Sequence, residues 1–218
     1  MSIAERLAGI RTRMDAACVA AGREPSSVRL VAVSKTKPLS AIAEAHAAGQ
    51  VVFGENYAQE LRDKAREKPD VEWHFIGHLQ RNKAKYVAGT AALVHAVDSV
   101  RLARELGKRA PTDILVEVNV GEEVSKAGVL PLEALSLCKE LSSLDGVRLR
   151  GLMTIPPFDD TPGRHFKVLA DLAAEGRRQG LPLTELSMGM SADFEVAIAH
   201  GATLVRVGSA IFGPRSRP

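Results

Sequence analysis

The sequence is poor in cysteine and in aromatic residues, and no part of it is a long apolar run. Cys18 and Cys138 are the two cysteines, and no Cys-x-x-Cys motif occurs. A disulfide framework is therefore not indicated, and both thiols are expected to be reduced and partly buried. Aromatic residues are 4% of the chain, too few for the base-stacking platforms of nucleic-acid-binding proteins. No stretch resembles a membrane span or a signal-peptide core, so a cytoplasmic protein without a membrane partner is expected.

The charge and the length are those of an ordinary globular protein. The 29 Lys and Arg residues are mixed with 26 Asp and Glu residues, which leaves a net charge of +3. This charge is too mild and too evenly spread for a nucleic-acid footprint. The 218 residues can bury a substantial core without disulfide or metal cross-links. No linker or low-complexity tract is visible, so residues 1–218 are expected to form a single domain.

Short apolar runs alternate with helical patterns along the whole chain. A helix with a Ser2/Glu5 capping box and a stop at Gly22 is expected before the first run. The later helices are expected to end near residues 48, 68, 87, 108, 144, 179 and 200, and the fourth of these to be capped by Asp98 or Ser99. The expected strands are residues 28–33, 51–56, 72–77, 93–97, 113–120, 147–155, 183–190 and 202–208.

Strand and helix thus alternate about eight times, which predicts a parallel sheet covered by helices. Eight such units in one domain predict an α/β fold of the (β/α)8 TIM barrel type, with an additional N-terminal helix. An open doubly wound sheet is the alternative. It is disfavoured because no Gly-x-Gly-x-x-Gly motif follows the first strand.

Lys35 lies where the first strand turns into a loop. Residues 28–33 read as a buried strand, and Ser34 then breaks the apolar run. In a barrel, the carboxyl end of a strand faces the rim that carries the chemistry. Lys37 is the nearest competitor for a chemical role. An ordinary solvated lysine is the alternative interpretation of either residue.

Two later loops have the composition of a phosphate site on the same rim. Ser191, which is expected to cap a helix starting at Ala192, follows the seventh strand; Gly208 and Ser209 follow the eighth. Barrels often bind phosphate at these two loops, with hydroxyl and backbone N–H donors. Either loop alone would be read as an ordinary strand-to-helix turn with a serine cap.

A rim lysine facing a phosphate site suggests pyridoxal 5'-phosphate, which needs a lysine for its Schiff base and a separate anchor for its phosphate. Arg206 interrupts the last apolar strand, where a buried charge needs a partner. Because an arginine cannot accept a hydrogen bond, it would keep a nearby pyridine nitrogen unprotonated. The alternative is an arginine salt-bridged at one end of the barrel.

These residues lie in motifs that run nearly end to end through the chain. The sequence resembles the pyridoxal-phosphate homeostasis proteins, which are single-domain relatives of the alanine racemase N-terminal barrel. The matching motifs are residues 33–38 (VSKTKP), 53–56 (FGEN), 74–83 (HFIGHLQRNK), 151–154 (GLMT), 186–193 (LSMGMSAD) and 205–213 (VRVGSAIFG).

The resemblance implies a fold-type III barrel in which Lys35 carries the Schiff base. It places Asn56, Ser191, Gly208 and Ser209 around the cofactor, with Arg206 facing its ring nitrogen. The family is thought to bind, buffer and hand over pyridoxal phosphate without robust catalysis. The expected partners are therefore the small-molecule cofactor and, as recipients, apo-enzymes that need it, and no catalytic residue is assigned.

Three other functions are alternatives to this interpretation. An amino-acid racemase would need a second base, for which Tyr57 is the only plausible substitute; the racemase-type dimerising domain is missing from the sequence, so a monomer is expected. A phosphate-binding barrel enzyme without pyridoxal phosphate would leave Lys35 unexplained. A metal enzyme is disfavoured because His74 and His78 are not in a ligand motif such as HExxH, and they read as structural or surface histidines.

Overall fold

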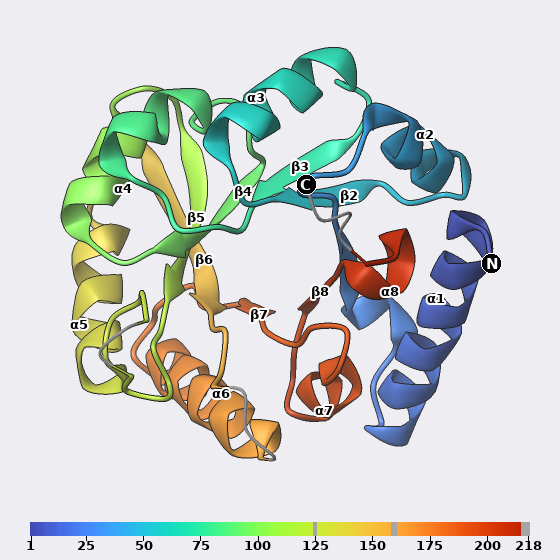
Figure 1. The fold of residues 1–218 in the computed structure, drawn as a ribbon. Coiled ribbons are helices and arrows are strands. Elements are labelled where there is room, and N and C mark those ends of the chain that lie inside the picture. Colours follow the sequence, from blue (N-terminus) through green and yellow to red (C-terminus); the bar gives the residue numbers. More distant parts are fainter. Residues whose placement is uncertain (124–125, 158–160, 215–218) are drawn as a thin grey trace.

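The structure, a computed structural model, describes residues 1–123, 126–157 and 161–214. Within these residues, eight parallel strands follow one another in chain order around a closed barrel, and the last strand pairs with the first (Figure 1). The (β/α)8 barrel predicted from the alternation is confirmed, and the closure of β1 on β8 rules out the open doubly wound sheet. The strands are β1 Arg29–Val33, β2 Val52–Glu55, β3 Glu72–Phe75, β4 Leu93–Val97, β5 Thr112–Glu117, β6 Val147–Met153, β7 Glu185–Ser187 and β8 Leu204–Val207.

Helices surround the barrel, one after each strand (Figure 1). A short 3-10 helix, η1, precedes β1. None of the helices in the described ranges is both long enough and apolar enough to cross a lipid bilayer. The helices are η1 Pro25–Ser27, α2 Leu39–Ala47, α3 Ala58–Glu67, η2 Arg81–Tyr86, α4 Val100–Gly107, α5 Pro131–Ser142, α6 Pro162–Arg178, α7 Phe194–Ala199 and α8 Ser209–Phe212.

The additional N-terminal helix α1, Ile3–Ala20, covers the side on which the barrel closes. It starts with the predicted capping box, in which Ser2 Oγ accepts from Glu5 N at 3.2 Å and Glu5 Oε2 accepts from Ser2 N at 2.7 Å. The helix packs against α2, α7 and α8. Arg6 Nη1 donates to Ile211 O of α8 at 3.2 Å. Helix α1 therefore holds in place the short helix that follows β8.

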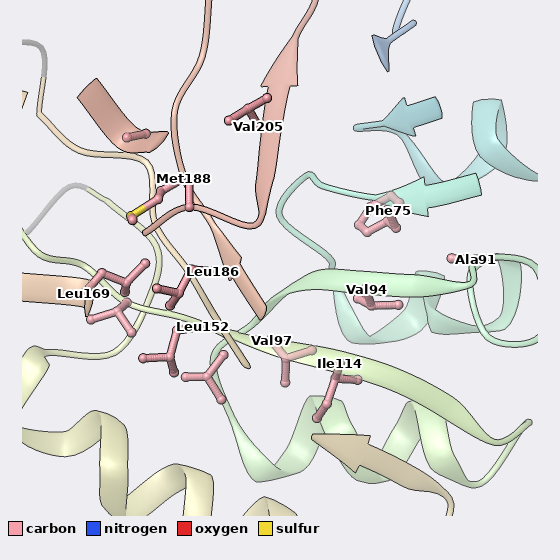
Figure 2. Packing of buried hydrophobic residues seen from close by; sticks show 14 of the residues in the cluster. Phe75, Ala91, Val94, Val97, Ile114, Leu152, Leu169, Leu186, Met188 and Val205 are labelled. Atoms are coloured by element: carbon pink, nitrogen blue, oxygen red, sulfur yellow. The ribbon is translucent and has the colours of Figure 1, made fainter. Parts of the chain in front are cut away.

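Outward-facing strand residues pack against the apolar stripes of the helices, and we call this layer the helix–barrel shell. Successive residues of a strand point to opposite faces, so every second strand residue enters the shell. Figure 2 shows part of it, with Leu152 and Leu186 of β6 and β7 near Leu169 of α6. Other members of the shell are Phe53, Trp73, Ile114 and Val205 from strands, and Leu61, Leu106, Leu141, Cys138 and Phe166 from helices.

The inward-facing residues fill the barrel interior and are of two kinds. An apolar group consists of Val31, Val52, Leu93, Ala96, Leu115, Met153 and Leu204. Polar side chains share the interior with it, namely His74, His95, Ser187 and Arg206, all of them buried. The alternation is clearest in β8, where Val205 and Val207 join the shell and Leu204 joins the interior group.

The structure departs from the sequence expectations at several helix starts and strand ends. The segment 79–87 is not an α-helix but contains the 3-10 helix η2, in which Ala84 is the one buried residue. Ser191 does not cap a helix. Asp193 Oδ1 accepts from Met190 N at 2.6 Å and closes a turn, so α7 begins at Phe194. Ser99, rather than Asp98, caps α4. Strands β3, β5, β6 and β7 stop two or three residues earlier than expected, at the rim.

Candidate functional site

The turn after β1 places Lys35 on the carboxyl-terminal rim of the barrel. Lys37 N donates to Ser34 O at 3.0 Å and closes the turn. Thr36 at its centre has a φ of 63°, a left-handed conformation that is unfavourable for a β-branched residue. Glu60 of α3 holds it there, because its Oε1 accepts from Thr36 N at 2.7 Å. The strained turn fixes the backbone on either side of Lys35.

A buried ion pair supports this turn from below. Lys64 Nζ donates to Ser34 O at 2.7 Å and to Glu55 Oε1 at 2.8 Å, and it also pairs with Glu60. Ser34 Oγ donates to the same Glu55 oxygen at 2.6 Å. Burial raises the pKa of Glu55, and the nearby Lys64 ammonium opposes that rise. Because an unpaired charge at this depth would be costly, the conformation of the turn depends on Lys64.

Both lysines of the turn line the cavity described below, and Lys37 also binds backbone carbonyls. Lys37 Nζ donates to the backbone carbonyls of Phe212, Gly213 and Pro214 at 3.1, 3.3 and 3.0 Å. These carbonyls lie at the end of α8, so Lys37 joins the first strand's loop to the last helix. This contact gives Lys37 a structural task, and Lys35 is the residue that the sequence predicts for chemistry on the rim.

A cavity of about 280 Å³ opens between the ends of β1, β7 and β8. Its walls include Lys35, Ser191, Arg206, Gly208 and Ser209. These residues come from opposite ends of the sequence, and the closure of β8 on β1 brings them together. Five of the six residues singled out in the sequence therefore line one cavity.

The two serines of the predicted phosphate anchor lie next to each other on the wall of this cavity. Ser209 Oγ donates to Ser191 Oγ at 3.5 Å, although the serines belong to different loops. Gly208 lies where β8 passes close to β1, and a Cβ at this position would come within 3.2 Å of the Val33 Cβ and carbonyl oxygen. The glycine thus permits the close approach that keeps both loops at one site.

Arg206 forms the floor of the cavity and is 4% exposed. Its Nη1 donates to Ser187 Oγ at 2.6 Å and its Nη2 donates to Thr154 O at 2.8 Å. Burial lowers the pKa of Arg206 to about 10, while the Glu117 carboxylate favours the charged form. The guanidinium therefore stays protonated at neutral pH and can only donate hydrogen bonds to a group in the cavity.

Asn56 lines a second cavity, of about 250 Å³, together with Gly77, His78, Glu117 and Lys126. Within the described residues, Asn56 Oδ1 and Glu117 Oε2 are buried without a hydrogen-bond partner. Burial also raises the pKa of Glu117. Buried acceptors without donors are rare in folded proteins. The structure therefore separates Asn56 from the other five residues but gives it an unsatisfied acceptor, as expected of a group that binds a ligand.

Sequence reasoning missed the buried polar partners below the cavity. Ser187 and His95 are fully buried. Ser187 contacts both Arg206 and His95 through its hydroxyl. Their signal was a polar residue at an inward-facing position of an otherwise apolar strand. Among the described residues, no group of three or more His, Cys, Asp or Glu side chains could hold a metal ion. Cys18 and Cys138 have free thiols, and both are fully buried where partial burial was expected.

Comparison with known proteins first identifies the class of barrel. The family model described as "Alanine racemase, N-terminal domain" matches residues 8–216. The fold and the rim cavity therefore define a barrel of the alanine racemase N-terminal type. The match covers every strand and both rim loops.

Full-length relatives then narrow this assignment. A protein of Aquifex aeolicus named "Pyridoxal phosphate homeostasis protein" is 44% identical over 226 residues, which span 99% of each chain. A protein of Escherichia coli with the same name is 43% identical and covers 98% of this chain and 97% of its own. The structure of PipY from Synechococcus elongatus with PLP bound has a TM-score of 0.85 and 40% identity, over 97% of this chain and 100% of that one. The chain belongs to the family of pyridoxal phosphate homeostasis proteins.

Proposed function

We propose that this protein binds pyridoxal 5'-phosphate on the rim of the barrel, with Lys35 holding the cofactor's aldehyde carbon as a Schiff base. Ser191, Ser209 and the backbone at Gly208 hold the phosphate, and Arg206 faces the ring nitrogen. The observation that carries this proposal is the single cavity that unites a lysine, a pair of adjacent hydroxyls and a buried guanidinium.

The residues present fit this cofactor. The lysine and the serine pair lie on the wall of the same cavity, as a ligand with an aldehyde at one side and a phosphate at the other requires. The unsatisfied Asn56 Oδ1, which lines the second cavity, can accept from a donor of a ligand that reaches it. The names of the relatives and the PLP-bound PipY structure support the same cofactor.

We propose further that the protein buffers the cofactor and hands it over to apo-enzymes, without robust catalysis. The relatives are named for homeostasis and not for a reaction, which supports this role. In this proposal residues 1–218 act as one pyridoxal-phosphate-binding domain, monomeric and in the cytoplasm.

The test is the visible absorption spectrum of the purified protein, followed by borohydride reduction and peptide mapping. We expect a yellow protein whose reduced cofactor is fixed to the peptide that contains Lys35. Lys35→Ala should abolish the label and the visible band, whereas the matched variant Lys37→Ala should keep the label on Lys35. A label on Lys37, or a visible band that survives Lys35→Ala, would show that the assignment is wrong.

An amino-acid racemase remains the alternative, and Tyr57 would have to provide its second base. The Tyr57 side chain is 57% exposed at the start of α3, a poor position for the defined proton-transfer geometry that a base requires. Incubating the loaded protein with L-alanine should therefore leave its chirality unchanged. Turnover on the order of 1–10³ per second, lost in Tyr57→Phe, would establish the racemase instead.

A further inference from the structure

A continuous chain of polar side chains crosses the barrel interior below the cavity. Arg206 Nη1 lies 2.6 Å from Ser187 Oγ, which lies 2.8 Å from His95 Nδ1. His95 Nε2 lies 2.9 Å from His74 Nδ1, and His74 Nε2 lies 2.7 Å from Glu72 Oε1. We call these five residues the interior chain. It connects β8, β7, β4 and β3.

The interior chain runs from one end of the barrel to the other. Arg206 forms part of the cavity at the carboxyl ends of the strands. Glu72 is the first residue of β3 and pairs with Arg29, the first residue of β1, at 3.2 Å. Both side chains of this pair are partly exposed, whereas His74, His95 and Ser187 are completely buried. The chain thus connects the cavity to an ion pair on the opposite face.

The hydrogen bonds of the interior chain fit one arrangement of protons. Arg206 can only donate, so Ser187 Oγ accepts from it. At the other end, the hydrogen bond from His74 lowers the pKa of Glu72, which accepts as a carboxylate. Burial lowers the pKa of both histidines, so each is neutral and carries a single ring proton.

The positions of the two ring protons follow from these ends. His74 carries its proton on Nε2, because that nitrogen donates to Glu72. Its Nδ1 therefore accepts, and His95 Nε2 donates to it. His95 Nδ1 then accepts from the Ser187 hydroxyl. Every donor points away from Arg206 and towards Glu72, and every group along the chain is satisfied.

We propose that Ser187, His95 and His74 are positioning residues, which hold the Arg206 guanidinium in one orientation towards the cavity through a fixed order of hydrogen bonds that ends at Glu72. A buried polar group without a partner is costly, and apolar residues could fill the same space. The interior chain is complete and ends on Arg206 at the cavity. Holding the Arg206 side chain in one orientation explains why polar residues occupy these buried positions. The positioning role rests on the proposed function in one respect only, namely that the ligand facing Arg206 is pyridoxal phosphate.

The first experiment needs no cofactor. Nitrogen-15 NMR of the cofactor-free protein, labelled on histidine, reports which ring nitrogen of each of the six histidines carries a proton. Spectra of His74→Gln and His95→Gln assign the two signals. We expect both residues to be neutral with the proton on Nε2 at pH 7. A proton on Nδ1 of His95, or a doubly protonated ring at either position, would overturn the proposed order.

The second experiment measures the effect on the bound cofactor. His95→Leu removes the contact to Ser187, whereas His95→Asn retains an acceptor at the position of Nδ1. We expect His95→Leu to shift the visible absorption maximum of the pyridoxal-phosphate-loaded protein. It should also weaken cofactor binding on the order of tenfold, which corresponds to the loss of about one charge-assisted hydrogen bond between Arg206 and the cofactor. His95→Asn should restore the wild-type absorption maximum at least in part.

A control separates positioning from damage to the core. Leu115 belongs to the apolar interior group and is fully buried, so Leu115→Ala lowers stability without touching the interior chain. Its absorption maximum should equal that of the wild type. An unchanged maximum in His95→Leu, or an equal shift in Leu115→Ala, would exclude the positioning role. If wild-type protein binds no cofactor, the proposed function fails, and the NMR result still decides the order of the hydrogen bonds.

Discussion

The helix–barrel shell and the barrel interior are both buried, yet they are built from different residues. The clustered residues of the shell are apolar, from Phe53 on β2 to Phe166 on α6. The interior combines an apolar group around Leu115 with the interior chain that leads from Glu72 to Arg206. Both regions exclude water, but the hydrogen-bonded chain that reaches the cavity crosses the interior, whereas the buried polar contacts between β2 and α3 are, among the described residues, confined to the Glu55–Lys64 pair and Ser34 at the rim.

This difference separates the tasks of the two regions. Apolar burial in the shell is roughly proportional to area and non-directional, so the shell stabilises the barrel without specifying a site. The interior chain specifies the orientation of Arg206 at the cavity. Substitutions in the shell should therefore change stability, and substitutions at the rim or in the interior chain should change binding.

The largest expected effect is on stability, from truncating a shell residue. Phe166→Ala should lower the free energy of unfolding by about 3–5 kcal/mol, because it removes a fully buried aromatic ring and leaves a cavity. Leu132 on α5 is 97% exposed, and Leu132→Ala is the control that should stay within about 0.5 kcal/mol of wild type. Denaturant unfolding gives both values. Weaker cofactor binding by the folded Phe166→Ala protein would contradict the separation of tasks.

An intermediate effect is expected at the rim, and it is on binding. Ser191→Ala combined with Ser209→Ala should weaken cofactor retention at least about tenfold, or about 1.4 kcal/mol, because the adjacent hydroxyls no longer donate to the phosphate. Thermal unfolding of the cofactor-free double variant should match wild type. Ser143→Ala, an exposed serine at the end of α5, is the matched control in a dialysis measurement. Unchanged retention in the double variant would place the phosphate elsewhere.

The smallest expected effect concerns Glu117 and depends on pH. Burial raises the pKa of this carboxyl above its unfolded value, so the folded state binds more protons than the unfolded state between the two pKa values. Stability is then retained below the unfolded pKa and decreases as the pH rises through the folded pKa. Glu117→Gln should raise the unfolding free energy of the cofactor-free protein by about 1 kcal/mol at pH 7.

The comparison with pH 4 sharpens this prediction. Near pH 4 the Glu117 carboxyl is protonated in the folded protein, so Glu117→Gln should have almost no effect there. Glu122→Gln, in the loop after β5, is the control and should have almost no effect at either pH. A constant difference between Glu117→Gln and wild type at both pH values would assign the effect to packing and not to charge.

The barrel and most of the rim could be predicted from the sequence because their signals are local. Lys35 lies two residues after the end of an apolar run, and Ser191 and Ser209 follow two other strands, so each position could be predicted without knowing its neighbours in space. The start of α7 could not be predicted in the same way, because the Asp193 side chain closes a turn that competes with the helix.

The residues around Arg206 needed the three-dimensional structure. His95 and Ser187 are 92 residues apart and meet across the interior, and no local pattern pairs them. Lys37 was recognised as a competitor of Lys35. Its carbonyl partners lie up to 177 residues away, so its structural task became visible only in the closed barrel.

The seam between β1 and β8 has a consequence for how the protein is made. Its partners are the most distant in the chain, as in the pairing of Arg29 with Leu204, and contacts of this kind form late because a long loop must close first. The cavity does not exist until that seam forms, since Lys35 and Ser209 lie on its two sides. A ribosome-bound chain that still lacks its eighth strand therefore has no complete rim cavity, because Arg206, Gly208 and Ser209 are missing from its wall. Cofactor capture is in this sense a signal that synthesis has passed the last strand.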